Sequence, residues 1–403
     1  MITLAVIGGG AAGMMAALEA ASRGAAVSVF ERQSRVGRKL AVTGNGRCNL
    51  SNVHASPASY HGADQDFTVP ALEEFGPEET LGYFKRLGLV TTVQPDGRVY
   101  PLSDTAGSVV DVLRLSMEAA GVQLYDGCEV SRLEKRNTKF LVTCQDGSFE
   151  ADRVIVACGG MAGERFGGTK LGYRLLEQMG HHCTPLRWSL VQLRSDNPGC
   201  RSLKGIRADA GVTVYSGGKT IASSAGEVQF TDYGLSGPAI FEVSRAALEH
   251  EGSVVVLDLL RGISEEELAK MLSRRARNTP QLTLGDAYVG TVQNRIGRVM
   301  VAAAGLKASA SITALSEETA AGLAKLAKHF EFPVTGDMGA ANAQVTVGGI
   351  KTAEFHGKTM ESRLCPGLYA CGEVLDIDGD CGGYNLQWAW SSGRLAGRSA
   401  AEV

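Results

Sequence analysis

Six residues near the start of the chain have the types and spacing that bind the pyrophosphate of a dinucleotide. They read Gly-Gly-Gly-Ala-Ala-Gly and fit G-x-G-x-x-G at Gly8, Gly10 and Gly13. In this motif the first glycine permits a tight turn, the second lets the backbone approach the phosphates, and the third lets the following helix pack against its strand. Ala11 and Ala12 begin that helix, whose positive N-terminal end faces the phosphates. The spacing therefore predicts dinucleotide binding at residues 8–13.

Charged residues after the next predicted strand are placed to complete this half of the site. Glu31 ends that strand about twenty residues beyond the glycines, where a carboxylate accepts hydrogen bonds from a ribose diol. Arg32 follows directly and is included among the predicted contacts. Arg38 and Lys39 come soon enough afterwards to reach the pyrophosphate, and the alternative for these two residues is a solvated basic turn.

The C-terminal part of the chain carries a second glycine-rich segment after a predicted strand at 367–371. Gly372 follows that strand, and the acids Glu373 and Asp376 are suited to bind ribityl hydroxyls. Next, Gly382-Gly383-Tyr384-Asn385-Leu386-Gln387 begins a helix, and its backbone N–H groups would favour reduced, anionic flavin. FAD is long enough to need both segments, whereas NAD needs only the first. The sequence therefore predicts FAD as the bound cofactor.

Several longer blocks resemble the BaiN/YhiN-type flavoprotein family of NAD(P)/FAD-dependent oxidoreductases, over essentially the whole chain. These blocks are more specific than the first glycine motif, and they are Gly37 to Leu40, Thr43 to Asn52, Gly226 to Pro238, Thr359 to Ser362 and Gly372 to Trp388. The resemblance implies an α/β fold with three parts: a Rossmann-like FAD-binding domain with a parallel sheet, an inserted β-barrel-like domain and a small helical domain.

The resemblance also places a polar loop, Thr43-Gly44-Asn45-Gly46-Arg47-Cys48-Asn49, beside the flavin. There Arg47 would stabilise negative charge on reduced flavin or on a substrate carbonyl. Asn45, Cys48 and Tyr384 are further catalytic candidates. The alternative is that Asn45, Cys48 and Asn49 only satisfy backbone groups in a tight loop. No partner cysteine is near Cys48 in the sequence, so a disulfide-reductase mechanism is not expected.

Three residues at strand ends complete the predicted cofactor contacts. Val130 is the predicted neighbour of the adenine, and Cys158 and Gly159 follow another buried strand. No metal site is predicted.

The elements that position these residues follow from hydrophobic patterning. The apolar run 2–7, the Ala/Met/Leu-rich stretch 11–23 and the segment 26–31 predict a strand, helix and strand of a parallel sheet. Further strands are predicted around 124–130, 140–144 and 154–157. The strand at 367–371 is expected to rejoin the first sheet.

Changes in pattern along the chain predict the domain limits. Residues 1–187 and 343–403 are expected to form the FAD-binding domain. Residues 188–262 are expected to form a β-rich inserted domain, with part of 333–347 as an optional addition. Residues 263–332 are expected to form the helical domain, which opens with Ser264 as N-cap and Glu267 at the capping-box position.

Composition limits the kinds of partner. A net charge of −3 over 403 residues gives no overall field that attracts nucleic acid or an anionic membrane. Nine cysteines without a C-x-x-C pair predict neither a disulfide framework nor a zinc or iron–sulfur site, and favour a reducing cytoplasm. No apolar stretch approaches the roughly 18 residues of a membrane span.

The leading functional hypothesis is a reductase in which NAD(P)H gives hydride to flavin N5, and the flavin passes it to an activated C=C or C=O of a small molecule. No second G-x-G-x-x-G lies between 160 and 340, so NAD(P)H is expected to dock only transiently.

A second hypothesis, which the family suggests, is reduction of uridine to dihydrouridine in ribosomal RNA. Its supporting feature is a set of basic residues that would contact phosphates, Arg274, Arg275, Arg277, Arg295, Arg298 and Lys307. An amine oxidase that produces hydrogen peroxide is a third hypothesis, and a non-catalytic FAD-binding protein is a fourth.

Overall fold

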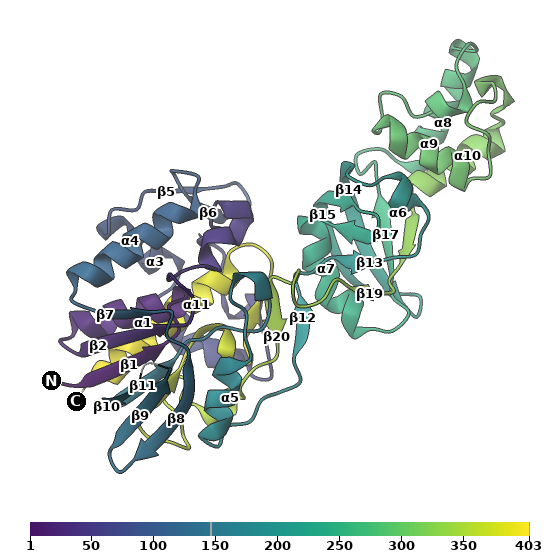
Figure 1. Ribbon diagram of the computed structural model, residues 1–403. Coiled ribbons are helices and arrows are strands. Elements are labelled where there is room, and N and C mark those ends of the chain that lie inside the picture. Colours follow the sequence, from purple (N-terminus) through teal and green to yellow (C-terminus); the bar gives the residue numbers. More distant parts are fainter. Residues whose placement is uncertain (146, 403) are drawn as a thin grey trace. The chain divides into compact units, whose positions relative to one another are not determined.

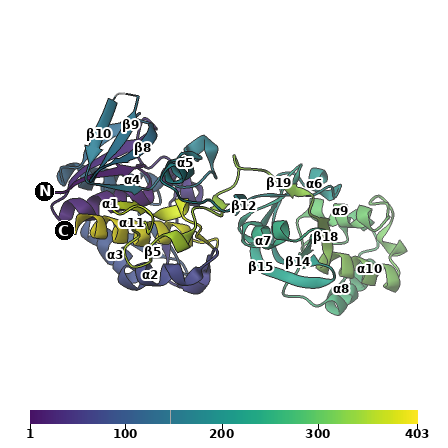
Figure 2. The same ribbon diagram turned by 90° about the horizontal axis from the view of Figure 1, so that it is seen from below.

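The computed structural model describes residues 1–145 and 147–402, which fall into two compact units (Figure 1). The first unit combines residues 1–188 with the segment that begins at Gln344, and the second comprises residues 189–343. Each unit has its own buried hydrophobic core. The two ends of the chain lie side by side on the first unit in both views (Figures 1 and 2).

A five-stranded parallel sheet forms the centre of the first unit, in the order β21-β11-β1-β2-β7. The strands are Leu368–Ala370 (β21), Arg153–Val156 (β11), Thr3–Ile7 (β1), Ala26–Glu31 (β2) and Gln123–Asp126 (β7). Leu4 to Ile7 are buried, as expected for a strand that is covered on both faces. The pairing of β11 with β21 confirms that the strand predicted at 367–371 rejoins the first sheet.

Two helices from opposite ends of the chain pack backbone to backbone beside this sheet. These are α1 (Ala11–Ser22) and α11 (Tyr384–Ala401). A Cβ atom on Gly393 would lie 2.4 Å from Ala12 O, and one on Gly397 would lie 2.3 Å from Ala16 O. The helices therefore approach more closely than any side chain at these two positions allows.

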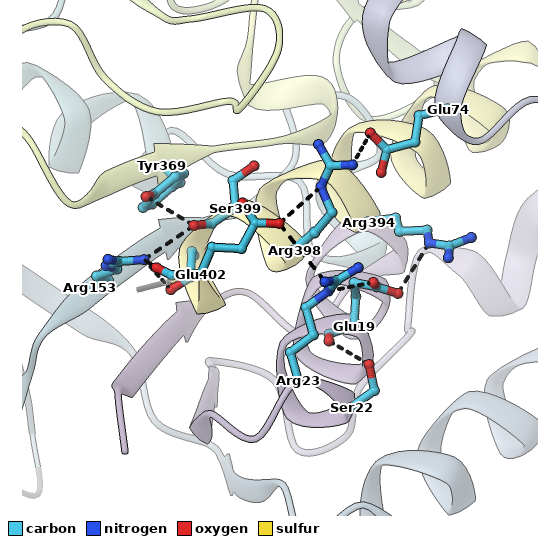
Figure 3. Close-up of polar contacts among 11 residues, drawn as sticks. Glu19, Ser22, Arg23, Glu74, Arg153, Tyr369, Arg394, Arg398, Ser399 and Glu402 are labelled. Carbon is cyan, nitrogen blue, oxygen red and sulfur yellow. Dashed lines mark hydrogen bonds and ion pairs between the residues drawn. The ribbon is translucent and has the colours of Figure 1, made fainter.

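An ion pair joins the same two helices, and a second one ties α11 to residue Glu74 (Figure 3). The buried carboxylate of Glu19 in α1 binds Arg23 Nε at 3.0 Å and Arg394 Nε of α11 at 3.1 Å. Arg398, one turn further along α11, pairs with Glu74 at 2.6 Å. Because Glu19 is almost fully buried, loss of Arg394 would leave part of its charge uncompensated.

Smaller sheets and helices surround the central sheet of the first unit. The sheets are β10-β9-β8 (Gly147–Ala151, Lys139–Cys144, Val130–Arg136), β3-β6-β5 (Ser51–Asn52, Arg98–Pro101, Thr91–Val93) and β22-β4 (Asp378–Gly379, Tyr60–His61). Strand β12 (Arg187–Ser189) pairs with β20 (Val345–Val347). The helices are α2 (Val69–Glu74), α3 (Pro77–Arg86), α4 (Ala106–Ala119) and α5 (Leu171–Gln178).

The second unit combines a seven-stranded sheet with helices around a single core, in the strand order β18-β17-β14-β15-β16-β13-β19. These strands are Phe330–Pro333, Val254–Asp258, Arg207–Ser216, Lys219–Phe230, Gly234–Ser236, Leu193–Arg194 and Gly336–Asp337. The helices are α6 (Gly199–Ser202), α7 (Pro238–Glu249), α8 (Glu265–Asn278), α9 (Asn294–Ala303) and α10 (Glu317–Lys328). The division of this unit into a β-rich and a helical domain stays a prediction.

Two local expectations have clear outcomes. The capping box at the start of α8 is confirmed, because Ser264 Oγ accepts a hydrogen bond from Glu267 N and Glu267 Oε2 accepts one from Ser264 N. The single strand expected at 124–130 is wrong. Gly127 adopts a positive φ of 73° and splits this stretch between β7 and β8, which belong to different sheets.

Among the residues that the structure describes, no helix is long and apolar enough to cross a membrane.

Candidate dinucleotide site and family

The first glycine loop has the geometry of a phosphate-binding turn between β1 and α1. Gly8 adopts a φ of +109° and donates its N–H to Phe30 O of β2 at 2.9 Å. A Cβ atom on Gly13 would lie 1.9 Å from Gly8 O, so only glycine lets α1 start this close to the strand. A Cβ on Gly10 would instead meet no atom within 4 Å. The backbone therefore faces open space where a pyrophosphate would approach.

Glu31 holds its carboxylate over this loop. Its Oε2 accepts a hydrogen bond from Gly9 N and its Oε1 accepts one from Gln33 N, both at 2.8 Å. Burial raises the pKa of this carboxyl, and the two backbone N–H donors only partly counter that effect. The side chain is thus fixed at the end of β2, where the sequence predicted a ribose contact.

Lys39 and Glu373 join the N-terminal half of the predicted site to its C-terminal half. Lys39 Nζ lies 2.8 Å from Glu373 Oε2, although 334 positions separate the two residues. Glu373 Oε1 accepts a further hydrogen bond from Thr346 N at 2.8 Å. Gly159 lies beside this carboxylate, and a Cβ there would have its nearest neighbour, Glu373 Oε2, at 4.0 Å. The Lys39–Glu373 ion pair therefore has unoccupied space next to it on the side of Gly159.

The start of α11 contacts the end of the polar loop, at Asn49, and the two residues that follow, Ser51 and Asn52. A Cβ on Gly383, which has a φ of +103°, would lie 2.3 Å from Ser51 O, so this contact requires glycine. Asn52 Nδ2 donates to Gly382 O at 3.0 Å. Asn49 Oδ1 is buried there without a hydrogen-bond partner in the protein. The same C-terminal segment reaches α1, since a Cβ on Gly372 would lie 2.9 Å from Ala12 Cβ.

Arg47 is held at the edge of this loop by two contacts. Its guanidinium carbon lies 4.4 Å from the centre of the Tyr100 ring, and its Nε pairs with Asp104. Its side chain remains accessible. The Arg47 charge is therefore fixed in direction and still available to a ligand.

Cys48 lies in a different environment from Arg47. Its side chain is fully buried, and burial raises the pKa of its thiol to about 12. A neutral, buried thiol is a poor nucleophile or acid at neutral pH. Asn45 next to it is exposed, with a φ of +57° that places it in the left-handed region.

The side chains of several predicted contact residues form hydrogen bonds within the protein. Arg32 Nη2 donates to Gly167 O at 3.0 Å, Arg38 pairs with Gln33, and the amide of Asn385 bonds to both backbone atoms of Gly379. Gln387 is buried and accepts from Ser51 Oγ at 2.6 Å. These side chains therefore have partners within the protein, and their predicted contacts with a cofactor stay predictions.

The remaining predicted contacts lie at strand ends, in loops and in the first turn of α11. Val130 and Asp376 are buried, Tyr384 and Leu386 are half-buried, and burial raises the pKa of Cys158 to about 12. Thr43 and Gly44 have non-helical backbone angles, with Gly44 at a φ of +57°, and form a kink within the 3-10 segment Leu40–Gly46.

Sequence reasoning missed residues that come next to the second half of the site only through sheet pairing. Arg98 and Tyr100 lie on β6, which pairs with β3, the strand that follows the polar loop. His61 lies on β4, which pairs with β22. The alternation of Arg98-Val-Tyr-Pro101 indicated a strand, but nothing in it indicated the partner strand.

The residues present fit an FAD. A glycine loop opens onto free space, a fixed carboxylate stands at the ribose position, and the C-terminal segment brings a helix start against the polar loop. No third acid, cysteine or histidine joins any pair at metal-binding spacing in residues 1–145 and 147–402.

Comparisons with known proteins agree with this site. The family model described as "HI0933-like protein Rossmann domain" matches residues 2–399. The chain is 36% identical over 408 residues to a 3-dehydro-bile acid delta(4,6)-reductase of Clostridium scindens, with 100% of each chain covered. It is 30% identical over 392 residues to a ribosomal RNA dihydrouridine synthase of Escherichia coli, with 96% of this chain and 95% of that protein covered.

A solved structure shows the same fold. The 3-ketosteroid-delta4-(5alpha)-dehydrogenase of Rhodococcus jostii superposes with a TM-score of 0.53 at 16% identity, over 99% of this chain and 96% of that chain. This likeness concerns the fold alone. The family match and the relatives show that the chain belongs to the HI0933-like Rossmann-domain family, and that it is an FAD-dependent oxidoreductase of mixed α/β fold, as its sequence predicted.

Proposed function

We propose that this protein is a reductase that passes hydride from NAD(P)H, by way of FAD, to an activated C=C bond of a small cyclic ketone. The observation that carries the proposal is the Lys39–Glu373 pair, because it brings the two glycine-rich segments, predicted separately, to one place. FAD supplies the two-electron chemistry when bound, and the protein supplies binding, orientation and electrostatics.

The chain's own residues suit a reaction in which negative charge develops. The N-terminal N–H groups of α11 have no acceptors inside the helix and carry its positive dipole end. Arg47 adds a fixed positive charge on the polar loop. Both favour an anionic reduced cofactor or an enolate-like transition state. Buried Cys48 takes no part in this account.

The substrate class comes from the relatives. The Clostridium scindens protein is named a reductase of a 3-dehydro-bile acid with 4,6 unsaturation, that is, of a conjugated enone, and it matches this chain along its full length. An enone carbonyl activates the C=C bond toward hydride because the resulting charge spreads onto oxygen. The donor, NAD(P)H, is proposed to dock transiently, since residues 160–340 contain no second dinucleotide motif.

Anaerobic titration separates the two halves of this proposal. NADH or NADPH is expected to bleach the flavin absorbance of the purified protein, and 3-oxochola-4,6-dienoic acid is expected to restore it. If neither nicotinamide bleaches the band, nicotinamide is not the donor. If the dienone fails to restore it, the enone substrate is wrong. Hydrogen peroxide released with small amines would favour an oxidase instead.

The second candidate is reduction of uridine to dihydrouridine in ribosomal RNA, which the names of two relatives support. Exposed basic residues of the second unit would bind phosphates, namely Arg274, Arg277, Arg298 and Lys307. Two more of the predicted set are tied to backbone carbonyls, because Arg275 donates to Ala287 O and Arg295 donates to Ser202 O. Equal dihydrouridine in ribosomal RNA from a deletion strain and its parent would remove this candidate.

A further inference from the structure

His61 and Asp380 form a pair beside the start of α11 that the cofactor site does not use. His61 Nε2 lies 2.7 Å from Asp380 Oδ1. An ionised carboxylate only accepts hydrogen bonds, so Nε2 is the donor and the ring's Nδ1 stays available for another partner. The His61 side chain is 33% exposed, which gives it access to solvent protons.

Backbone pairing places the His61–Asp380 pair next to the glycines Gly382 and Gly383 that precede α11. Strand β4 pairs with β22 in the register His61 opposite Asp378 and Tyr60 opposite Gly379. Asp380 N donates to Ser59 O at 3.1 Å, and Asp380 O accepts from Asn385 Nδ2 at 3.3 Å. The backbone of Asp380 is therefore held from both sides, by the β4 segment and by the first turn of α11.

Tyr60 ties strand β4, which carries His61, to the start of α11. Its ring is buried, and its hydroxyl donates to Tyr384 O at 3.1 Å. A Cβ on Gly379 would lie 2.9 Å from Tyr384 Cβ and 3.2 Å from the Tyr60 ring. These contacts fix His61 relative to α11 through a paired strand and a buried ring.

We propose that His61 is the proton donor of the oxidative half-reaction and that Asp380 is its positioning residue; this inference rests on the proposed enone reduction. Hydride from the reduced cofactor forms a C–H bond at the substrate's β-carbon, and the C=C electron pair moves toward the carbonyl. The Nδ1–H bond of the His61 ring, protonated on both nitrogens with Nε2–H donated to Asp380, breaks, and its proton forms the second new bond, at the α-carbon or the oxygen. The substrate gains two electrons and two hydrogens, the cofactor loses two electrons, and imidazole recovers its proton from water.

The first test locates His61 without measuring turnover. Diethyl pyrocarbonate is expected to modify His61 in the apoprotein, as mapped by mass spectrometry, and added FAD is expected to protect it. His329, exposed in the second unit, serves as the internal control that FAD leaves reactive. Equal modification of His61 with and without FAD would overturn the proposal, because the imidazole would not border the cofactor.

The second test separates the half-reactions in stopped flow. His61→Gln is expected to leave flavin reduction by NAD(P)H unchanged and to slow reoxidation by 3-oxochola-4,6-dienoic acid by about 100-fold or more, the usual contribution of a general acid. Asp380→Asn keeps an acceptor for Nε2 and is expected to slow the same step by less. His54→Gln, an exposed histidine on the neighbouring turn, is the matched control.

Outcomes of the second test distinguish the two proposals. If the dienone does not reoxidise the reduced wild-type protein, the result contradicts the proposed function and therefore this inference as well. Reoxidation at equal rates in wild type and His61→Gln overturns this inference alone. A solvent deuterium effect on reoxidation that is present in wild type and absent in His61→Gln supports it.

Discussion

Substitution of Gly393 by alanine tests whether the two ends of the chain are joined as tightly as the structure indicates. The new Cβ would lie 2.4 Å from Ala12 O, in the first turn of the helix that follows the glycine loop. Backbone atoms of a buried helix do not yield as a flexible side chain does. The helices must separate by roughly 1 Å, since comfortable contacts lie near 3.5 Å.

Two opposing effects set the expected size. Overpacking of this kind costs about 1–3 kcal/mol, whereas alanine gains about 1 kcal/mol over glycine within a helix. We expect Gly393→Ala to lose about 1 kcal/mol of unfolding free energy. The double variant with Gly397→Ala, whose Cβ would lie 2.3 Å from Ala16 O, should lose about twice as much if the two sites add.

Gly82→Ala is the matched control in the same unit. It lies inside α3, and its Cβ would have only the flexible Arg86 Nη1 nearby, at 3.6 Å. This variant should gain about 0.5–1 kcal/mol. Urea unfolding followed by tryptophan fluorescence suits the comparison, because Trp388 and Trp390 are buried in α11. Gly393→Ala as stable as Gly82→Ala would refute the backbone-to-backbone packing.

Three further predictions concern single groups. Burial raises the pKa of Glu31 above its ordinary value of about 4.5, so its carboxylate should become protonated at a higher pH than usual. FAD affinity should therefore weaken as the pH is lowered toward that range. Glu31→Gln should remove this pH dependence in a binding titration. With the pKa of Cys48 raised to about 12, iodoacetamide at pH 8 should leave Cys48 unlabelled in the native protein, and Cys48→Ser should still be reduced by NAD(P)H; labelling in the folded state would contradict its burial. Burial lowers the pKa of His181, which lies 2.9 Å from both Glu354 and Ser362, so the unfolded chain binds more protons below about pH 6.5 and stability should fall there as pH drops; His181→Asn should flatten that part of the denaturation profile.

The first half of the site could be predicted because its signals are local. The G-x-G-x-x-G loop lies between a strand and a helix, and Glu31 ends the next strand, so contiguous sequence determines their geometry. The return of β21 to the sheet was also predictable, since a buried strand followed by glycines needs a parallel neighbour.

The second half was predicted only in part, because it depends on contacts between distant segments. The contact of Lys39 with the pyrophosphate stays a prediction; its ion pair with Glu373 could not be predicted, because no local pattern contains both residues. The backbone N–H groups of residues 382–387 were predicted to point toward the flavin, which stays a prediction, and the side-chain amides of Gln387 and Asn385 bond to groups within the protein. Their types fit either role, and only the register of β3, β4 and β22 decides between them.

Hydrogen–deuterium exchange with and without FAD tests the central claim most directly. If both glycine-rich segments hold one cofactor, FAD should slow exchange at residues 8–13 and at residues 382–387 together, with the same dependence on FAD concentration. Protection confined to residues 8–13, with the start of α11 unchanged at saturating FAD, would contradict the account.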